Sequence, residues 1–510
     1  MDFLILINLG KRMRKIVLVL GLASAATSFA CTTIIVGKDA TTDGSILIAR
    51  NDDGGSANSP SHLIYHQPRA KGYLFKSVEE NKYTYQLPDN LMGYTGMPDW
   101  GTRNTDGGGT FEEVGFNDAG VGISATETIF SNASTLKVDP YVTESGIVEE
   151  AIPSILLPQI KSARQGVEML GKIIETTGAG EGFGVAFVDG KEAWYLENAG
   201  GHQWLAVRLP DNSYFVSGNQ SRLGEVDLKD TKNYLASPDL ITFAEKNGLY
   251  NPKTDGKFNF HKVYGKNDTT NPSVYNNDVT YNYQRVISLQ GKYTPSTLKH
   301  PVTNGDFAVF LKPEHKLSVA DVESGLQSYY QGTSMDPYTS QNPQSKYRPI
   351  AVFRTQQSHV MQVREKLPAP IANVTYVNLG MTALSIYVPF YYGAVIPEYY
   401  QMGGDTADNK SAFWKFRKLQ TLAMQNFPKY APIVQAGFAS LNQQIAKQQK
   451  EFEKQYVKVY AKDPKAAQQL LDNFTNQTQE QVFTEVDKLT NQIFTDLTNQ
   501  VNTTYHFEGA

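Results

Sequence analysis

Strand-like and helix-like segments occur in separate blocks along this chain of 510 residues. β-Branched and apolar runs at 32–36, 46–50 and 114–125 precede a stretch at 146–176 whose apolar residues have helical spacing. More strand-like runs fill 184–216. Blocks of this kind favour an α+β protein built from layered sheets over alternating β–α–β units.

The second half of the chain is less regular. Residues 225–283 are polar and predict long loops or an insertion. Strand-like pieces return at 350–354, 359–363 and 385–388. We expect these pieces to complete the sheets that begin in the first half.

The last hundred residues are rich in Gln, Lys and Asn and show helical periodicity. Their clearest apolar stripe runs from Val482 to Val501, and Thr478 with Gln481 predicts a capping box at its start. This region predicts two to four amphipathic helices packed on the body. A coiled-coil surface for a partner is the alternative.

Residues 1–30 have the three parts of an export signal. A basic segment at 11–15 precedes an apolar run at 16–22 and mostly small residues up to Ala30. The apolar run is shorter than the roughly 20 residues that span a bilayer, so we expect cleavage before Cys31 and a periplasmic, cell-surface or extracellular protein. Lipidation of Cys31 is the alternative, although Ser28 and Phe29 do not fit a lipoprotein signal.

Cys31 is the single cysteine of the chain, which rules out an intrachain disulfide and any site with several cysteine ligands. Cleavage would make it the first residue, and its α-amine could then act as general base for its own thiol. An amine with a pKa of about 7.7 to 8.0 is well matched to a thiol of about 8.5. None of the eight histidines lies in a recognisable triad motif. The alternative is a buried, inert thiol.

A β-hairpin is predicted at the start of the mature chain, because the runs 32–36 and 46–50 flank a segment with Asp43-Gly44. This hairpin would bring Arg50 and Asp53 close to Cys31. A guanidinium there could stabilise a thiolate, and Asp53 could hold the α-ammonium.

Charge and composition exclude some functions. Lys and Arg total 47 against 51 Asp and Glu, a net charge of -4, which gives no electrostatic case for a nucleic-acid partner. The Gly-rich segment 106–110 lacks the lysine of a phosphate-binding loop. We therefore expect neither a cofactor nor a metal ion.

The residues around Cys31 and Arg50 resemble the start of the mature cysteine dipeptidases of the dipeptidase A and secernin family, which are N-terminal-nucleophile hydrolases. The resemblance covers roughly residues 31–400, with further matching segments at 115–128, 160–166, 197–204, 347–350 and 387–391. It implies a four-layer αββα sandwich, to which the tail would add a C-terminal helical extension. It also implies dipeptides or short peptides as substrates.

More distant relatives, the choloylglycine hydrolases, resemble this chain in the residues of their active site. Their nucleophile, arginine and aspartate match Cys31, Arg50 and Asp53. Their oxyanion-hole asparagine resembles Asn219 and their later arginine resembles Arg285, so the resemblance implies catalytic roles for both.

One position departs from those amidases. Where they place another asparagine, this chain has Glu127. A carboxylate could bind a free α-ammonium, so we hypothesise that Glu127 restricts the substrate to unblocked dipeptides.

These observations divide the chain into a signal at 1–30, a peptidase domain at 31–405 and a helical region at 406–510. The leading hypothesis is an exported cysteine dipeptidase that forms an acyl-enzyme on Cys31. An amidase for N-acylated small molecules and a lipid-anchored binding protein modified at Cys31 are the alternatives. An oligomer is possible, and no membrane-spanning segment is expected in the mature chain.

Overall fold

The computed structural model describes residues 31–78, 81–101, 110–266, 278–339 and 345–507. The predicted export signal at 1–30 and nearly all of the Gly-rich segment 106–110 lie outside these residues.

One six-stranded antiparallel sheet carries the start of the described chain. Its strands, in the order β12-β1-β2-β14-β15-β16, are Tyr214–Ser217, Thr32–Val36, Ile46–Asp53, Thr355–Val363, Asn373–Leu379 and Val388–Tyr391. The predicted hairpin is confirmed, because β1 pairs with β2 and Thr33 lies opposite Arg50. Both strands are buried along their whole length, which suits their β-branched and apolar sequences.

The second six-stranded antiparallel sheet contains the strands predicted between 114 and 216, apart from β12. Its strands, in the order β13-β11-β10-β9-β8-β7, are Tyr234–Ala236, Gln203–Arg208, Ala193–Ala199, Phe183–Val188, Gly122–Thr128 and Val114–Phe116. Asn117 forms the turn between β7 and β8, where its Oδ1 accepts hydrogen bonds from the Ala119 and Val121 amides. Gly120 takes the positive φ of 77° that this turn requires.

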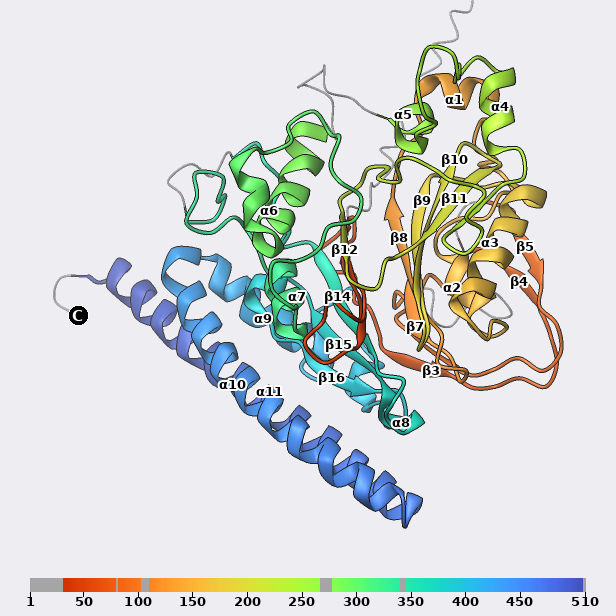
Figure 1. Cartoon of the computed structure of the whole chain (residues 1–510). Helices are drawn as coiled ribbons and strands as arrows, with labels where there is room; N and C mark the ends of the chain where they lie inside the picture. Colours follow the sequence, from red (N-terminus) through yellow and green to blue (C-terminus); the bar gives the residue numbers. More distant parts are fainter. Residues whose placement is uncertain (1–30, 79–80, 102–109, 267–277, 340–344, 508–510) are drawn as a thin grey trace, which may run out of the picture.

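The two sheets face each other across a shared core, to which β1 and β2 contribute Ile35 and Ile48 while β9 and β10 contribute Val188 and Tyr195. Helices α2 (Ala151–Leu156) and α3 (Ala163–Thr177) cover the outer face of the second sheet (Figure 1). Helices α6 (Gln284–Tyr293) and α7 (Val319–Leu326) cover the first. The predicted α+β fold with four αββα layers is confirmed.

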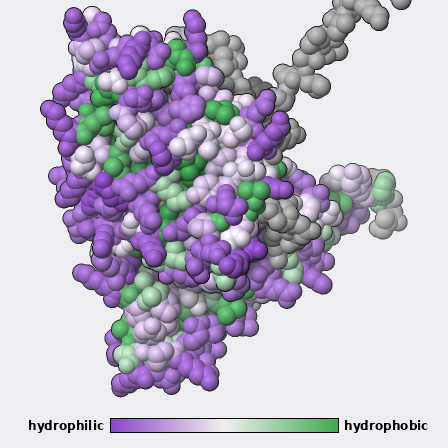
Figure 2. All heavy atoms as spheres, turned by 90° about the vertical axis from the view of Figure 1, so that its right-hand side faces the viewer, coloured by the Kyte–Doolittle hydropathy of each residue, from purple (hydrophilic) through white to green (hydrophobic). Residues whose placement is uncertain are grey.

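The face that carries α3 and α4 (Leu240–Lys246) is mainly hydrophilic, with scattered hydrophobic residues (Figure 2). This follows from the amphipathic sequence of α3, whose apolar residues Val167, Leu170 and Ile174 are fully buried against the second sheet. The helical stretch predicted at 146–176 is split into two helices, and Ser162 caps the second through a hydrogen bond from the Gln165 amide.

Other elements lie at the edges of the sandwich. Three of them, β13, α4 and α5, lie within 225–283, where the sequence predicted long loops or an insertion. A π-helical turn at Val279–Tyr283 leads directly into α6. Apart from short 3-10 turns and the C-terminal helices, the other strands and helices in the described part of the chain are β3 (Ile64–His66), β4 (Leu74–Lys76), β5 (Thr84–Gln86), β6 (Tyr94–Gly96), α1 (Ala133–Val138), α4 (Leu240–Lys246), α5 (Phe260–Tyr264) and α8 (Ala369–Ala372).

The strand expected at 350–354 is wrong, because β14 begins at Thr355. The main chain there bonds to another loop instead of a sheet. The Ala351 amide donates to the Ser328 carbonyl, and the Tyr338 hydroxyl donates to the Ala351 carbonyl.

Three helices form the C-terminal region, in agreement with the predicted two to four: α9 (Ala412–Met424), α10 (Phe427–Tyr460) and α11 (Pro464–Thr504). Helices α10 and α11 run side by side as a long antiparallel pair (Figure 1). They pack on the body, where Tyr391 of β16 contacts Phe452 and Phe474 at ring distances of 5.4 and 5.9 Å. No helix in the described residues is long and apolar enough to cross a membrane.

The capping box predicted at Thr478 and Gln481 is wrong. Helix α11 begins at Pro464, and its cap is Asp463, whose side chain accepts hydrogen bonds from the Lys465 and Ala466 amides. Threonine is common at helix starts, which is why Thr478 suggested one. Here it is instead a buried residue in the middle of α11.

Glu323 of α7 provides a test of this packing. Burial raises the pKa of its carboxyl to about 7 from 4.5, and a hydrogen bond of 3.3 Å from Asn442 of α10 offsets the shift only in part. Between these two pH values the folded protein keeps a proton that the unfolded chain has released, so stability falls as pH rises. Relative to the parent, Glu323→Gln should therefore gain about 2 to 3 kcal/mol between pH 4.5 and 7.5.

Urea unfolding at several pH values measures this difference. Glu480→Gln, at an exposed position of α11, is the matched control and should show a constant difference. A pH-independent difference for Glu323→Gln would contradict the prediction.

Candidate active site

Cys31 directly precedes β1 and is buried, with 1% of the residue exposed. Because Thr33 faces Arg50 in the β1–β2 ladder, Cys31 extends the same register toward Asp52. Arg50 donates a hydrogen bond from Nη1 to Cys31 Sγ at 3.3 Å. The thiol is buried, as an inert cysteine would be, but it contacts a guanidinium, which favours the thiolate.

Arg50 also forms an ion pair with Glu113, which immediately precedes β7 on the facing sheet. Burial opposes the charge of Arg50, but the nearby Glu113, Cys31 and Asp52 outweigh it and raise the pKa of the guanidinium. The arginine therefore stays positively charged beside the thiol. The pair also connects the two sheets at the site.

Asp52 completes a group of three acidic side chains. Cys31 Sγ and one carboxylate oxygen each of Asp52 and Glu113 lie within 4.8 Å of one another. Burial raises the pKa of both carboxyls, and the charge of Arg50 lowers both. The charge of Asp53 further raises the pKa of Asp52, and the charge of Asp52 further raises that of Glu113. The hydrogen bond between the two carboxyls lowers the pKa of Asp52 and raises that of Glu113. Two carboxyls held this close share a proton in the absence of a further cation.

Thiol and carboxylate donors can bind metal ions. Here the Arg50 guanidinium already lies against two of the three donors, Cys31 and Glu113. A metal ion at the same point would meet that positive charge, so the arrangement fits an arginine-centred site better than a metal site.

Asp53 ends β2 and is fully buried. Its carboxylate pairs with Arg348 and accepts a hydrogen bond from Thr355. Arg354 donates to the Asp53 carbonyl at 2.6 Å. These contacts fix Asp53, the aspartate that the sequence predicted to hold the α-ammonium, one residue beyond Asp52.

Arg285 of α6 reaches the main chain of Cys31 from the helix side. It is fully buried, and it donates from Nη1 to the Cys31 carbonyl and, at 3.0 Å, to Thr32 Oγ1. It also donates to Asn219 Oδ1 at 2.8 Å, to Asn282 Oδ1 and to the Tyr281 carbonyl. The structure therefore brings together Cys31 and Arg285, which are 254 residues apart.

Asn219 lies in the loop after β12, and Asn282 holds its main chain. The Asn219 amide donates to Asn282 Oδ1, and Asn282 Nδ2 donates to the Asn219 carbonyl, both at 3.0 Å. Because Arg285 engages the side-chain oxygen, the amide nitrogen of Asn219 points away from Arg285. Glu197 holds the next part of this loop through Ser221 Oγ and the Arg222 amide.

Glu127 belongs to β8 and lies opposite Gly184, next to an irregularity in the ladder. Its side chain is outside the part of the structure that is described, so its predicted contact with substrate stays a prediction.

Sequence reasoning missed Glu113, Asn282 and the contact role of Arg348. Glu113 directly precedes a predicted strand, and period-two alternation would place one of Glu112 and Glu113 between the sheets. Arg348 lies in the segment 347–350 that resembles the dipeptidase family, but the resemblance gave this residue no role. No local pattern singles out Asn282.

The histidine nearest to this group in the ladder is His359, which faces Arg50. Its ring nitrogens bond to Ser124 Oγ at 2.9 Å and Gln357 Oε1 at 3.0 Å. Burial, assisted by Arg50, lowers its pKa far below the usual value. It is a neutral bridge between the sheets.

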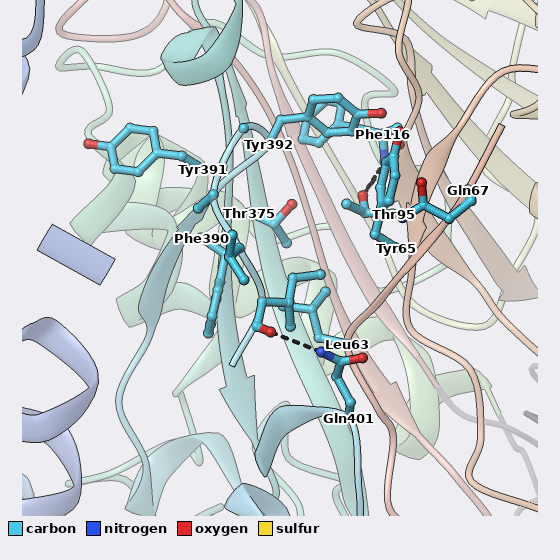
Figure 3. Close-up of a pocket in the computed structure, with 14 residues that line it drawn as sticks. Leu63, Tyr65, Gln67, Thr95, Phe116, Thr375, Phe390, Tyr391, Tyr392 and Gln401 are labelled. Atoms are coloured by element: carbon cyan, nitrogen blue, oxygen red, sulfur yellow. Dashed lines mark hydrogen bonds between the residues drawn. The ribbon is translucent and has the colours of Figure 1, made fainter. Parts of the chain in front are cut away.

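A cavity of about 480 Å³ lies elsewhere, between the β3–β6 pair and the end of the first sheet (Figure 3). Figure 3 shows Tyr65 and Gln67 on one side and Phe390 and Tyr392 on the other. Its lining includes neither a charged residue nor a nucleophile. We place the chemistry at Cys31 because the reactive groups converge there.

The four αββα layers, a buried thiol bonded to Arg50 and a carbonyl of the same residue bonded to Arg285 are the features expected of a cysteine hydrolase. The model of peptidase family C69 matches residues 30–438. The chain therefore belongs to this family.

Individual relatives agree with this membership. A probable dipeptidase of Salmonella dublin is 51% identical over 377 residues, covering 74% of this chain and 83% of the relative. A probable dipeptidase B of Lactococcus lactis subsp. lactis (strain IL1403) is 35% identical over 410 residues, covering 79% and 83%. The predicted family is confirmed, and these relatives support a cysteine-type dipeptidase.

Among solved structures, a variant of the conjugated bile acid hydrolase from Clostridium perfringens covers 75% of this chain and 98% of its own. The TM-score is 0.28 at 13% identity, which is too low to support an argument about function.

Proposed function

We propose that this protein is an exported cysteine dipeptidase that hydrolyses unblocked dipeptides or short peptides through an acyl-enzyme on Cys31. The observation that carries the proposal is the contact of the Cys31 thiol with Arg50 while Arg285 bonds to the carbonyl of the same residue. Membership of a peptidase family and the names of its relatives support the same activity.

In the proposed reaction, removal of residues 1–30 frees the α-amine of Cys31. The amine takes the thiol proton, and the thiolate, stabilised by Arg50, attacks the carbonyl carbon of the substrate. The Asn219 side-chain amide donates to the oxyanion that forms. The ammonium then protonates the leaving amine, which departs and leaves a thioester on Cys31.

Water completes the cycle. The α-amine of Cys31 removes a proton from a water molecule that attacks the thioester, and the thiol leaves with that proton. Asp53 and Arg285 act as positioning groups, because they hold the end of β2 and the main chain of the nucleophile. Glu127 is kept as a proposed substrate contact.

Two alternative functions differ from this proposal in the substrates they cleave or in the state of Cys31. An amidase would cleave N-acylated compounds better than free dipeptides. A lipid-anchored binding protein would carry an acyl group on Cys31 and hydrolyse neither.

Mass spectrometry tests the proposal directly. The purified mature protein should begin at an unmodified Cys31. Mixing it with a dipeptide and quenching in acid should add the mass of one aminoacyl residue to the peptide that starts with Cys31. A different first residue or a lipid on Cys31 would overturn the mechanism, and faster cleavage of an N-acetylated dipeptide would favour the amidase.

A further inference from the structure

We propose that the carboxylates of Asp52 and Glu113 form the subsite that binds the free α-ammonium of the substrate. The inference rests on the proposed function, because it assigns a substrate contact for acyl transfer to Cys31. It concerns specificity rather than the chemical step.

Distance is the first argument. The α-nitrogen of a peptide lies about 2.5 Å from the first carbonyl carbon, and that carbon must come within roughly 3 to 3.5 Å of Sγ to react. A group that binds the ammonium must therefore lie a few ångströms from Sγ. Asp52 and Glu113 each place a carboxylate oxygen within 4.8 Å of it.

The second argument is an oxygen atom that accepts no hydrogen bond. Asp52 Oδ2 accepts one from Gln357 at 3.2 Å, whereas its Oδ1 is buried and accepts none within the described residues. Asp52 is only 5% exposed. A buried carboxylate oxygen without a donor is costly, and an ammonium with three N–H groups would supply one.

Charge is the third argument. Arg50 contacts Cys31 and Glu113 directly, whereas it acts on Asp52 only through its charge. The hydrogen bonds of the Asp52 carboxylate are made with the neutral amide of Gln357 and with Glu113. The adjacent His359 is neutral, because burial lowers its pKa. Ionisation of the thiol moves its proton to the α-amine of Cys31, so it supplies no new positive charge for the two carboxyls. A substrate ammonium would supply that charge and replace the proton that the two carboxyls share, which would leave to solvent.

This subsite accounts for a requirement for a free N-terminus. An acylated amine has no positive charge, and its acyl group would have to fit where the carboxylates converge. The buried Asp52 and Glu113 would then lose their counter-charge. The same geometry limits cleavage to the first peptide bond, since the ammonium must lie next to the reacting carbonyl.

Calorimetry in a Cys31→Ala background separates binding from catalysis. The probes are alanyl-alanine and propionyl-alanine, which differ only by the α-amine. We expect alanyl-alanine to bind at least about tenfold more tightly. Adding Asp52→Asn should reduce this preference to about twofold or less and leave the affinity for propionyl-alanine unchanged.

Glu112→Gln is the matched control. Glu112 adjoins Glu113 in sequence and is equally buried, but it bonds to His66, Tyr94 and Ser154. It should retain the preference for the free amine. Glu113→Gln should lose it and serves as the second test if Asp52→Asn does not fold.

Three outcomes would overturn the inference: equal binding of both probes to Cys31→Ala, survival of the preference in both pair variants, or its loss in Glu127→Gln alone. These outcomes are distinct from failure of the proposed function, which would appear as absence of dipeptide hydrolysis in the parent.

Discussion

Cys31→Ala is expected to lower kcat/KM for a dipeptide by about 10⁴-fold or more, because it removes the nucleophile on which the acyl-enzyme would form. The replacement leaves the α-amine of the mature chain in place. It therefore tests the thiol separately from the processing of the first thirty residues.

The control for this variant is stability. Cys31 is small, and its loss should cost no more than about 1 to 2 kcal/mol in urea unfolding. Cys31→Ser keeps a hydroxyl and should also be strongly impaired, because a hydroxyl is much harder to ionise than a thiol. Retention of more than about one hundredth of the parental activity in a folded Cys31→Ala protein would refute the mechanism.

Arg285→Lys is expected to lower kcat/KM by about 10²- to 10³-fold. Lysine keeps the charge, but a single ammonium cannot reproduce the planar fork that reaches the Cys31 carbonyl, Thr32 and Asn219 together. Both the nucleophile and the oxyanion donor would lose their alignment, so the loss should appear mainly in kcat.

Arg222→Lys is the matched control, because it distinguishes misalignment from general destabilisation. Arg222 is also buried, and its guanidinium donates to the carbonyls of Val216, Phe307 and Ala308. Within the described part of the chain these hydrogen bonds do not reach Cys31. Its replacement should lower stability by an amount similar to that of Arg285→Lys. A similar loss of kcat in both variants would show that Arg285 acts only through the fold.

Sequence patterns predicted most of the sandwich because strands and turns leave local signals. The hairpin from 32 to 53 follows from two β-branched runs around a turn, and its register places Arg50 near Cys31. Errors arose where distant contacts outweighed those signals. The segment 350–354 bonds to the loop around Ser328, and Thr478 is buried in a helix that continues past it.

The candidate site shows the same division. Cys31 and Arg50 lie in one hairpin, so their contact follows from strand pairing. Asp53 ends the same hairpin, but its carboxylate contacts Arg348 and Thr355. Glu113 lies 63 residues from Arg50 and on the other sheet. Nothing in either segment encodes that the two sheets stack with these side chains in contact.

The sequence by itself determined the separate blocks of strands and helices, the hairpin that follows the lone cysteine, and the family resemblance, because these depend on side-chain patterns over a few tens of residues. The tertiary structure alone decided which acids surround the thiol and which arginine holds its carbonyl. Those contacts arise when two sheets and a helix bury their apolar faces together, and the partners are then fixed by packing across long stretches of chain.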